Sequence, residues 1–507
     1  MSLTEWLHRA DSHGATSKAL VCGERSYSYS ELKEVITRVA AAFVEMKLPK
    51  GARICILSQN SDRAIISFWA AIWAGYIPNL MNTRWSVREL ELSLADCEAS
   101  LLLVDDSFIE SGEALEKACG FLDRLIFIGE RKDASSGTLS YEQLITASPC
   151  DDRSGTASDD VLLNYTGGTT GKGKGVVHTH SSISSALNIC FAENFYDHRK
   201  TLGLVVPLFH ISGILCMAAT LRSQGCLVVV PAFEPSRVLR LISEFNVETM
   251  MMVPTMCRML VSSEDFNKHD LSSLTSILYG GSPIDKSLLH ELFNALPNAE
   301  FFQVYGQTEG APISFLHPET HRARGDEERL GSAGNVAHGV SVSVRDSNGK
   351  ELAEGEVGEV CFKGEHVMNR YWNQPETTAQ TINDGWCHSG DVGYMDSGYL
   401  YIVDRLKDMI ISGGENVYTT EVENVLAACP GVSECAVIGV EDETWGERVH
   451  AYVVLGTSNQ HDLDVIQRHC RQSLAGYKVP RSFSILDALP LTAVGKIDKV
   501  ALRRMAL

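Results

Sequence analysis

The feature that most restricts the fold of this sequence is a regular alternation of short apolar runs with segments of helical periodicity. Residues 54–57 and 101–104 have the pattern of buried strands, and residues 62–74 between them have that of a buried helix. Ser30, and Ser86 with Glu89, mark the starts of two more helices. The alternation returns at 204–206, 227–230, 249–253, 274–279 and 301–305. Strands and helices that alternate in this way predict an α/β fold whose parallel sheet is covered on both faces.

The pattern also divides the chain into regions. Residues 331–403 break into short strand-like pieces separated by turns such as Asn348-Gly349 and Asp384-Gly385, which indicates a β-rich subdomain. After the charged run at 404–408 the alternation restarts on a smaller scale. We therefore predict a large N-terminal domain of βα-layered sheets over 1–403, which includes the β-rich subdomain at 331–403. A hinge at 404–408 and a small, mobile α+β C-terminal domain over 409–507 follow it.

Composition and charge exclude several classes of protein. The 507 residues are 44% apolar and 21% charged, which is typical of a folded globular chain. The net charge of −20 argues against a nucleic-acid-binding surface. The 14 cysteines lack paired or metal-ligand spacing, which favours reduced thiols over disulfides. The N-terminus has no signal-peptide pattern, and the uncharged runs at 64–83 and 201–221 are interrupted by Gly and Pro. We therefore expect no transmembrane segment and a cytoplasmic protein.

A glycine-rich stretch, NYTGGTTGKGKGVVHTH at 164–180, marks a candidate phosphate site. Glycines let backbone N–H groups approach a ligand closely, and the threonine hydroxyls and lysines of the stretch suit phosphate oxygens. Residues 168–174 fit GxxxxGK, but Gly175 stands where a Walker A loop needs Ser or Thr for the metal. The apolar residues on both sides predict a loop that joins two strands, with the next helix starting near Ser181 or Ser182.

Further segments follow the glycine loop along the chain, namely YGQTE (305–309), HSGD (388–391), VDRLKDMIISGGENV (403–417), GYKVPR (476–481) and PLTAVGKIDK (490–499). In order and spacing these segments resemble the motifs of the adenylate-forming superfamily. The resemblance is to acyl- and aryl-CoA synthetases of the fatty acid–, 4-chlorobenzoate– and 4-coumarate–CoA ligase type, and it covers essentially the whole chain. It implies an ATP-dependent ligase that converts a fatty or aromatic carboxylic acid into acyl-AMP, releases pyrophosphate and then transfers the acyl group to the thiol of coenzyme A.

The same resemblance implies a site for ATP and Mg²⁺. Lys496 matches the lysine that bridges the carboxylate and the α-phosphate, and Glu309 matches the Mg²⁺ carboxylate, a hard oxygen ligand of the kind that Mg²⁺ prefers. Asp391 matches the carboxylate that accepts both ribose hydroxyls, and Tyr305 the ring that stacks on adenine. The full set implied for ATP and AMP is Thr166, Gly167, Gly168, Thr169, Thr170, Gly171, Lys174, Gly281, Ser282, Pro283, Tyr305, Gly306, Gln307, Thr308, Asp391 and Arg405.

The resemblance also assigns the second half of the reaction. Lys407 matches the hinge residue about which the small domain rotates between adenylation and thioester formation. The residues implied for coenzyme A are Ser412, Gly413, Gly414, Glu415, Trp445 and Tyr477. Those implied for the acyl pocket are His210, Ile211, Ser212, Tyr279, Gly280, Gly281 and Val304. His210 matches a position bordering the reacting carboxylate, and a buried histidine bonded to a backbone carbonyl is an equally good interpretation.

Two departures and several alternatives stay open. Gly173 stands where the family usually has Pro, and Lys499 where it commonly has Arg. His178 and His180 are two residues apart on an expected strand, which is too few ligands for a metal site. An acyl-AMP ligase that loads a carrier protein shares most of the motifs. A non-catalytic nucleotide-binding protein would be expected to have lost Lys496 or Glu309, and both are present. The identity of the acid and a homodimeric assembly are left open.

Overall fold

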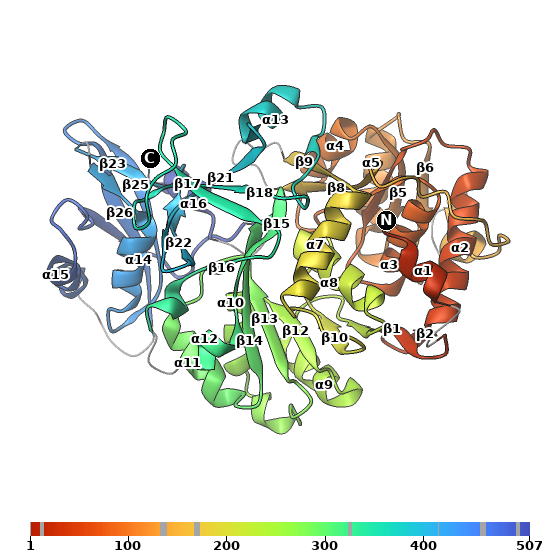
Figure 1. The fold of residues 1–507 in the computed structure, drawn as a ribbon, viewed down its shortest axis with the longest axis horizontal. Helices are drawn as coiled ribbons and strands as arrows, with labels where there is room; N and C mark the ends of the chain where they lie inside the picture. Colours follow the sequence, from red (N-terminus) through yellow and green to blue (C-terminus); the bar gives the residue numbers. More distant parts are fainter. Residues whose placement is uncertain are drawn as a thin grey trace. The chain divides into compact units, whose positions relative to one another are not determined.

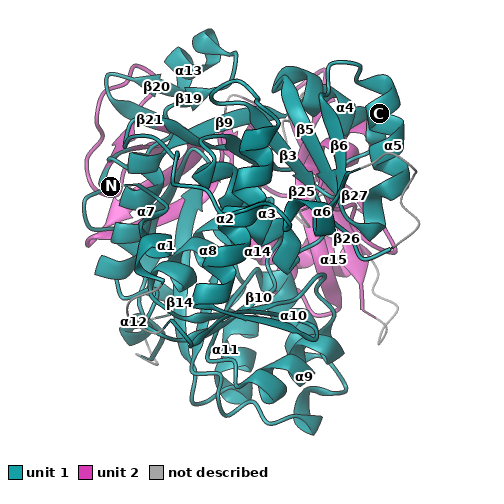
Figure 2. Cartoon of the chain, turned by 90° about the vertical axis from the view of Figure 1, so that its right-hand side faces the viewer, with its two compact units in different colours: residues 1–341, 363–387 teal, residues 342–362, 388–507 magenta. Residues whose placement is uncertain are grey.

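The computed structural model describes residues 2–10, 15–131, 139–166, 173–322, 327–413, 415–456, 463–492 and 497–506. The chain falls into two compact units, residues 1–341 with 363–387 and residues 342–362 with 388–507 (Figure 2). The segment predicted as a β-rich subdomain is therefore shared between the two units. The predicted boundary at 404–408 stays a prediction, because compactness in one conformation does not show where a chain pivots.

The first unit is built on a large sheet whose central strands are parallel and whose edges are antiparallel (Figure 1). Its strands, in spatial order, are β16 (Gly334–Val336), β15 (Gly310–Leu316), β14 (Glu300–Gln307), β13 (Ser276–Gly280), β12 (Thr249–Met252), β10 (Thr201–Leu204), β11 (Cys226–Val229), β1 (Lys18–Cys22) and β2 (Arg25–Ser28). The α/β prediction is confirmed. Gly306 lies inside β14 rather than at its tip, because β14 continues to Gln307 and returns as the antiparallel β15.

A second, parallel sheet lies in the same unit, with the order β4 (Ile77–Leu80), β3 (Arg53–Leu57), β5 (Ala99–Val104), β6 (Arg124–Phe127) and β7 (Leu139–Ser140). Helix α3 (Asp62–Trp73) contacts strands of both sheets, and nearly all of its residues are buried. Its apolar composition on every side explains this position, because a helix without a polar face is stable only in a core. A small sheet completes the unit, with the order β19 (Arg370–Tyr371), β9 (Lys174–Thr179) and β8 (Asp160–Thr166).

Side-chain caps fix where the helices of this unit begin. The predicted capping box of Ser86 and Glu89 is present at α4. The second helix starts before the predicted Ser30, because Glu31 reaches back to Ser28 and closes a capping box there. The helices are α1 (Glu5–Arg9), α2 (Tyr29–Glu45), α4 (Val87–Asp96), α5 (Ile109–Ala118), α6 (Tyr141–Leu144), α7 (His180–Ala192), α8 (Ile211–Arg222), α9 (Pro235–Phe245), α10 (Pro254–Val261), α11 (Lys286–Ala295), α12 (Pro318–Arg322) and α13 (Pro375–Thr381), with 3₁₀ turns at Asp106–Phe108, Phe266–Lys268 and Arg329–Gly331.

The second unit contains a run of four paired strands and a separate small sheet. One has the order β17 (Ser341–Arg345), β18 (Gly358–Lys363), β21 (Trp386–Asp396) and β22 (Tyr399–Arg405), and the short β20 (Ile382–Asn383) of the first unit pairs with the start of β21. The other has the order β24 (Glu415–Val417), β23 (Ile410–Ser412), β26 (Gly446–Leu455) and β25 (Val432–Asp442), with β27 (Ser482–Ile485) beside β26. Its helices are α14 (Thr419–Ala427), α15 (Leu463–Ser473) and α16 (Lys499–Met505). No helix among the described residues is both long and apolar enough to cross a membrane.

Candidate active site

The glycine-rich stretch begins in strand β8 and continues into strand β9. Strands β8 and β9 pair antiparallel, and Thr166 opposite Lys174 is the last pair before the turn. The prediction that the loop joins two strands is therefore confirmed. Helix α7 begins at His180, slightly before the predicted Ser181, because Thr179 and Ser182 cap it reciprocally. The predicted loop ligands Gly167, Gly168, Thr169, Thr170 and Gly171 lie outside the described residues.

A short strand from much later in the chain, β19, pairs along one side of this hairpin. Strand β19 pairs with β9, and Arg370 holds it there by binding Asp160 of β8 through both carboxylate oxygens, at 3.0 and 2.7 Å. The next residue, Tyr371, is only 3% exposed.

Gly173, just before β9, has little space around it. A Cβ on Gly173 would lie 2.8 Å from the carbonyl oxygen of Thr166. Position 173 therefore has no room for a side chain without a local shift.

The side chains of Tyr371, Glu309 and Lys174 meet at the end of this hairpin. The hydroxyl of Tyr371 donates to Oε1 of Glu309 at 2.6 Å, and Nζ of Lys174 lies 4.8 Å from the centre of the Tyr371 ring. The backbone N–H of Met368 donates to the carbonyl oxygen of Glu309 at 2.8 Å. Burial and the adjacent carboxylate of Glu309 raise the pKa of Tyr371, so its hydroxyl remains a donor. Tyr371 therefore contacts both charged groups, the carboxylate of Glu309 through its hydroxyl and the ammonium group of Lys174 through its ring.

His178 fixes the turn that carries Glu309. Its Nε2 lies 2.8 Å from the carbonyl oxygen of Thr308, and its Nδ1 lies 3.1 Å from the hydroxyl of Ser182. Burial lowers the pKa of His178 to about 4, so the ring is neutral and its Nε2–H donates to that carbonyl oxygen. His180 is the first residue of α7 rather than part of a strand, and its ring contacts the carbonyl oxygen of Ser154 at 2.8 Å. Both rings are structural.

Two buried asparagines hold the segment that leads to His210. The side-chain amide of Asn164 donates to the carbonyl oxygen of Phe209 at 2.8 Å, and the N–H of Leu208 donates to Asn60 at 2.9 Å. His210 is half-buried at the N-cap of α8, and its ring lies 4.6 Å from that of Phe209. The predicted neighbours Ile211 and Ser212 form the first turn of α8 and are also half-buried.

The remaining predicted residues of the first unit lie at the ends of β13 and β14. Tyr279 is buried, and its hydroxyl lies 2.8 Å from Nε2 of His321 and 3.2 Å from Oε1 of Gln303. Because strand side chains alternate, Tyr279 lies on the opposite face from its neighbour Gly280 and from Val304, which is paired with Gly280. The structure therefore places the Tyr279 ring in the core, apart from those two predicted pocket residues. Gly281, whose φ is +83°, is exposed, as is Pro283; Ser282, Tyr305, Gly306, Gln307 and Thr308 are half-buried.

The second unit holds another charged pair. Asp391 on β21 and Arg405 on β22 are paired residues, and Nε of Arg405 lies 3.0 Å from Oδ1 of Asp391. The Asp391 side chain is 5% exposed and that of Arg405 is 49% exposed, so the pair presents its guanidinium to solvent. Lys407 is exposed two residues further on. Lys499, the other departure from the family pattern, binds Glu423 at 2.8 Å and the hydroxyl of Thr419 at 2.6 Å.

Among the predicted coenzyme A residues, Gly413 lies against the exposed ring of Trp445. A Cβ on Gly413 would meet the ring of Trp445 at 2.7 Å, and the guanidinium of Arg481 lies 4.4 Å from the centre of that ring. Ser412 is buried, whereas Glu415 and Tyr477 are exposed. Gly414 and Lys496 lie outside the described residues. Beside the latter, Leu491 and Ile497 form an isolated antiparallel bridge.

The structural roles of several residues of this site could not be found from the sequence. Asn164 and His178 lie near the ends of the glycine-rich stretch and Asn60 lies in the polar run 58–63, and nothing in these segments indicates which groups they bind. Tyr371 carries no signal either, since its role depends on the pairing of β19 with a strand far away in the sequence.

Comparison with known proteins bears on the whole chain. The family model described as AMP-binding enzyme matches residues 7–372, and that of the AMP-binding enzyme C-terminal domain matches residues 421–496. A feruloyl-CoA synthase of Amycolatopsis is 36% identical over 99% of this chain and 98% of its own length. The medium/long-chain-fatty-acid–CoA ligase FadD8 of Mycobacterium tuberculosis is 34% identical over 96% and 86% of the two chains. The Bacillus subtilis o-succinylbenzoate CoA synthetase, solved with an acyl-adenylate intermediate, superposes with a TM-score of 0.85 at 30% identity over 99% and 97% of the chains.

Proposed function

Because this chain belongs to the AMP-binding enzyme family, we propose that the hairpin site of its first unit activates a fatty or aromatic carboxylic acid for ligation to coenzyme A. The protein is an AMP-forming acid–CoA ligase that uses ATP, Mg²⁺ and coenzyme A. One observation carries the placement of the site, namely that Tyr371 holds the carboxylate of Glu309 and lies under the ammonium group of Lys174 beside the glycine-rich turn.

The charges at this position suit the first half of the reaction. A carboxylate that attacks the α-phosphate of ATP brings two anions together, so the site must offset negative charge and align the groups. Lys174 supplies a positive charge, and the hydroxyl of Thr166 lies at the same end of the hairpin. Glu309 offers the hard oxygen ligand that suits Mg²⁺, which when bound offsets charge on the phosphates. By family resemblance we assign the turn residues 167–171 to the leaving pyrophosphate and Lys496 to the carboxylate and α-phosphate.

We assign the second unit to the ribose and to thioester formation. Asp391 can accept hydrogen bonds from both ribose hydroxyls, and Arg405 beside it offers donors to the same ligand. The exposed Trp445 ring with Arg481 offers a surface on which the adenine of coenzyme A could stack. Lys407 is proposed as the hinge. The free state of all described cysteines supports a cytoplasmic location for this activity.

The acid is the least constrained part of this proposal. The relatives named above act on feruloyl and on medium- or long-chain fatty acyl groups, so both classes are carried to this chain as candidates. The proposed pocket wall consists of His210, Ile211, Ser212, Gly280, Gly281 and Val304, with Tyr279 supporting it from the core.

A single assay tests the proposal. Purified protein with ATP and Mg²⁺ is supplied with straight-chain acids of increasing length and with benzoates and cinnamates. AMP and thioester are measured without a thiol acceptor, with coenzyme A, and with a carrier protein that bears a phosphopantetheine thiol. We expect stoichiometric AMP and acyl-CoA only when both an acid and coenzyme A are present. Release of AMP with a carrier-protein thiol but never with coenzyme A would instead identify a carrier-protein ligase. No acid-dependent AMP in any combination would contradict the proposal.

A further inference from the structure

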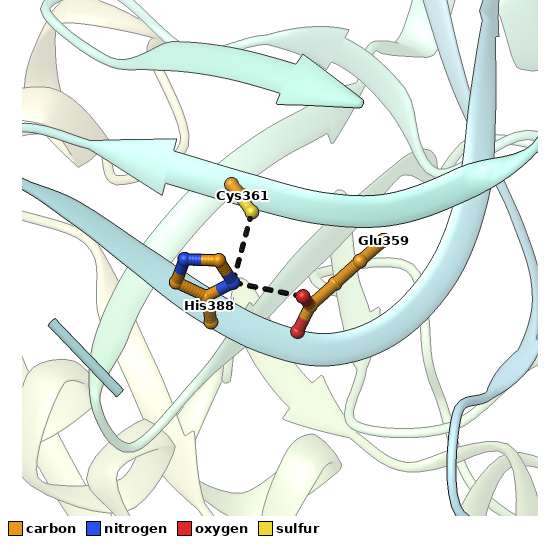
Figure 3. A group of neighbouring side chains, drawn as sticks. All are labelled: Glu359, Cys361 and His388. Atoms are coloured by element: carbon orange, nitrogen blue, oxygen red, sulfur yellow. Dashed lines mark hydrogen bonds and ion pairs between the residues drawn. The ribbon is translucent and has the colours of Figure 1, made fainter. Parts of the chain in front are cut away.

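A cluster of three potential metal ligands lies on the sheet that carries Asp391. Glu359 and Cys361 are two residues apart on β18 and so share one face, and His388 lies on the neighbouring strand β21. Nδ1 of His388 is 2.8 Å from Oε2 of Glu359 and 3.4 Å from Sγ of Cys361 (Figure 3). All three ligand atoms lie within 4.8 Å of one another, and no other such group of at least three occurs among the described residues.

The arrangement has a closed and an open side. Cys361 is fully buried, whereas the side chains of Glu359 and His388 are 21% and 26% exposed. An ion can therefore enter past the carboxylate and the imidazole and reach the thiol at the base. The donors are one oxygen, one nitrogen and one sulfur, a mixed set that zinc accepts and that Mg²⁺, which prefers oxygen ligands, does not.

The distances also suit a metal of this class. Zinc bonds to nitrogen, oxygen and sulfur are about 2.0–2.3 Å long, so ligand atoms around one tetrahedral zinc lie roughly 3–4 Å apart. The observed separations of 2.8 and 3.4 Å need only a small expansion. The thiol proton leaves when the metal binds, and the thiolate with the Glu359 carboxylate then matches the double positive charge.

We propose that Glu359, Cys361 and His388 form a binding site for a zinc-class divalent cation, and that an ion bound there slows acid activation. The site has three protein ligands and leaves a fourth position for water. The binding part of this proposal is independent of the proposed function, whereas the effect on activity rests on it.

The effect on activity follows from a second bond of Glu359. Its Oε1 accepts a hydrogen bond from the N–H of Gly390 at 3.1 Å, in the part of β21 that leads to Asp391. The same segment is held by Ser389, whose hydroxyl donates to the carbonyl oxygen of Val360 at 2.5 Å and accepts from the N–H of Asp391 at 3.0 Å. An ion that moves the Glu359 carboxylate away from His388 to make room for itself would strain the bond to Gly390 and move Asp391 from the position proposed for ribose binding.

Cobalt binding provides the direct test, because thiolate coordination gives Co²⁺ an intense near-ultraviolet charge-transfer absorption. Reduced, chelator-treated protein is titrated with Co²⁺ as wild type, as Cys361→Ala and Cys361→Ser, and as Cys435→Ala, which removes a thiol elsewhere in the same unit. We expect the wild type and Cys435→Ala to bind one Co²⁺ per chain with this absorption, and Zn²⁺ to displace it. Both Cys361 variants should lose the absorption and bind at least about tenfold more weakly. The same absorption in a folded Cys361 variant, or none in the wild type, would overturn the site.

The activity arm uses the same proteins. In the presence of excess Mg²⁺ and ATP, added Zn²⁺ should lower AMP release by the wild type and by Cys435→Ala, and a chelator should restore it. Cys361→Ala, whose side chain is outside the proposed reaction machinery, should resist the ion. Inhibition that is equal in all variants would overturn the link to activity. If no protein released AMP even without Zn²⁺, the proposed function would fail, while the Co²⁺ absorption would still decide the metal site.

Discussion

At the scale of single residues, the position of Glu309 depends on one hydroxyl group. The Tyr371 hydroxyl is buried and donates to the Glu309 carboxylate at 2.6 Å, and the Tyr371 ring also lies against Lys174. Tyr371 therefore acts as a positioning residue for two groups of opposite charge. Its own pKa is raised by burial and by Glu309, which keeps it protonated at any physiological pH.

We predict that Tyr371→Phe lowers kcat/KM for ATP by about 10- to 100-fold, because a hydrogen bond to a charged group contributes about 1.5–3 kcal/mol. The ring and its contact with Lys174 are retained. The Mg²⁺ concentration needed for half-maximal rate should rise, because Glu309 loses the hydroxyl that positions its carboxylate. Steady-state kinetics at several Mg²⁺ concentrations measure both effects. The matched control is Tyr29→Phe, which removes another buried hydroxyl, bonded to the carbonyl oxygens of Leu221 and Gly225, away from the site. Equal losses in both variants would contradict a positioning role.

At the scale of elements, the site depends on strand pairing between distant parts of the chain. Strand β19 carries Tyr371. It is joined to the β8–β9 hairpin by two residue pairs with β9 and by the ion pair between Arg370 and Asp160. Bidentate pairs of this kind fix orientation as well as position. The hairpin strands, β19 and the turn at Glu309 therefore form one structural unit.

Asp160→Asn should loosen β19 while the glycine-rich turn itself is unchanged. We expect KM for ATP to rise several-fold, with a loss of about 1 kcal/mol in the free energy of unfolding, because one partner of a partly exposed ion pair is neutralised. Denaturant unfolding and ATP kinetics measure these changes. Glu142→Gln serves as the control, since Glu142 pairs with Arg63 at 2.9 Å in a distant part of the same unit. An unchanged KM for ATP in Asp160→Asn would argue against the structural unit described above.

The sequence predicted most elements but few of their contacts. Apolar periodicity is local, so the alternating strands and helices, the hairpin and the Ser86–Glu89 capping box could be read from neighbouring residues. The helix caps at Ser28 and Thr179 were not predicted. The hydrogen bonds between Ser28 and Glu31, and between Thr179 and Ser182, place each cap before the serine that the sequence suggested. Tyr371, Asn164 and Glu359 were missed because their partners depend on strand register across long stretches of chain, which no local pattern encodes. Apart from the glycine-rich stretch, the motif residues were found only through family resemblance.

At the scale of the whole molecule, buried neutral histidines couple the fold to pH. Burial lowers the pKa of His178, His321 and His366 to about 4, from an ordinary value near 6.5. The unfolded chain therefore takes up protons between pH 6.5 and 4 that the folded chain does not. The stability of the fold is fully present above about pH 6.5 and decreases as the pH falls toward 4.

His321 allows this dependence to be measured outside the β8–β9 hairpin site. Its Nδ1 lies 2.8 Å from the carbonyl oxygen of His317, a contact that an asparagine amide can replace. We predict that His321→Asn reduces the slope of unfolding free energy against pH, between pH 6.5 and 4, by about 1.4 kcal/mol per pH unit. Chemical denaturation across that range gives the slope, with the exposed His290→Asn as the control. An unchanged slope in His321→Asn would mean that this ring is not the proton-linked group.

A Glu309→Gln variant separates the two halves of the reaction and so tests the role of this site most directly. Glutamine keeps the size of the side chain and can still accept the hydrogen bond of Tyr371, so only the negative charge is removed. Acid-dependent exchange of labelled pyrophosphate into ATP reports acyl-AMP formation, and thioester formation from supplied acyl-AMP and coenzyme A reports the second half. We expect exchange to fall by about 100-fold or more while thioester formation is retained. Exchange at the wild-type rate, or an equal loss of both half-reactions in a folded variant, would contradict the assignment of this site to acid activation.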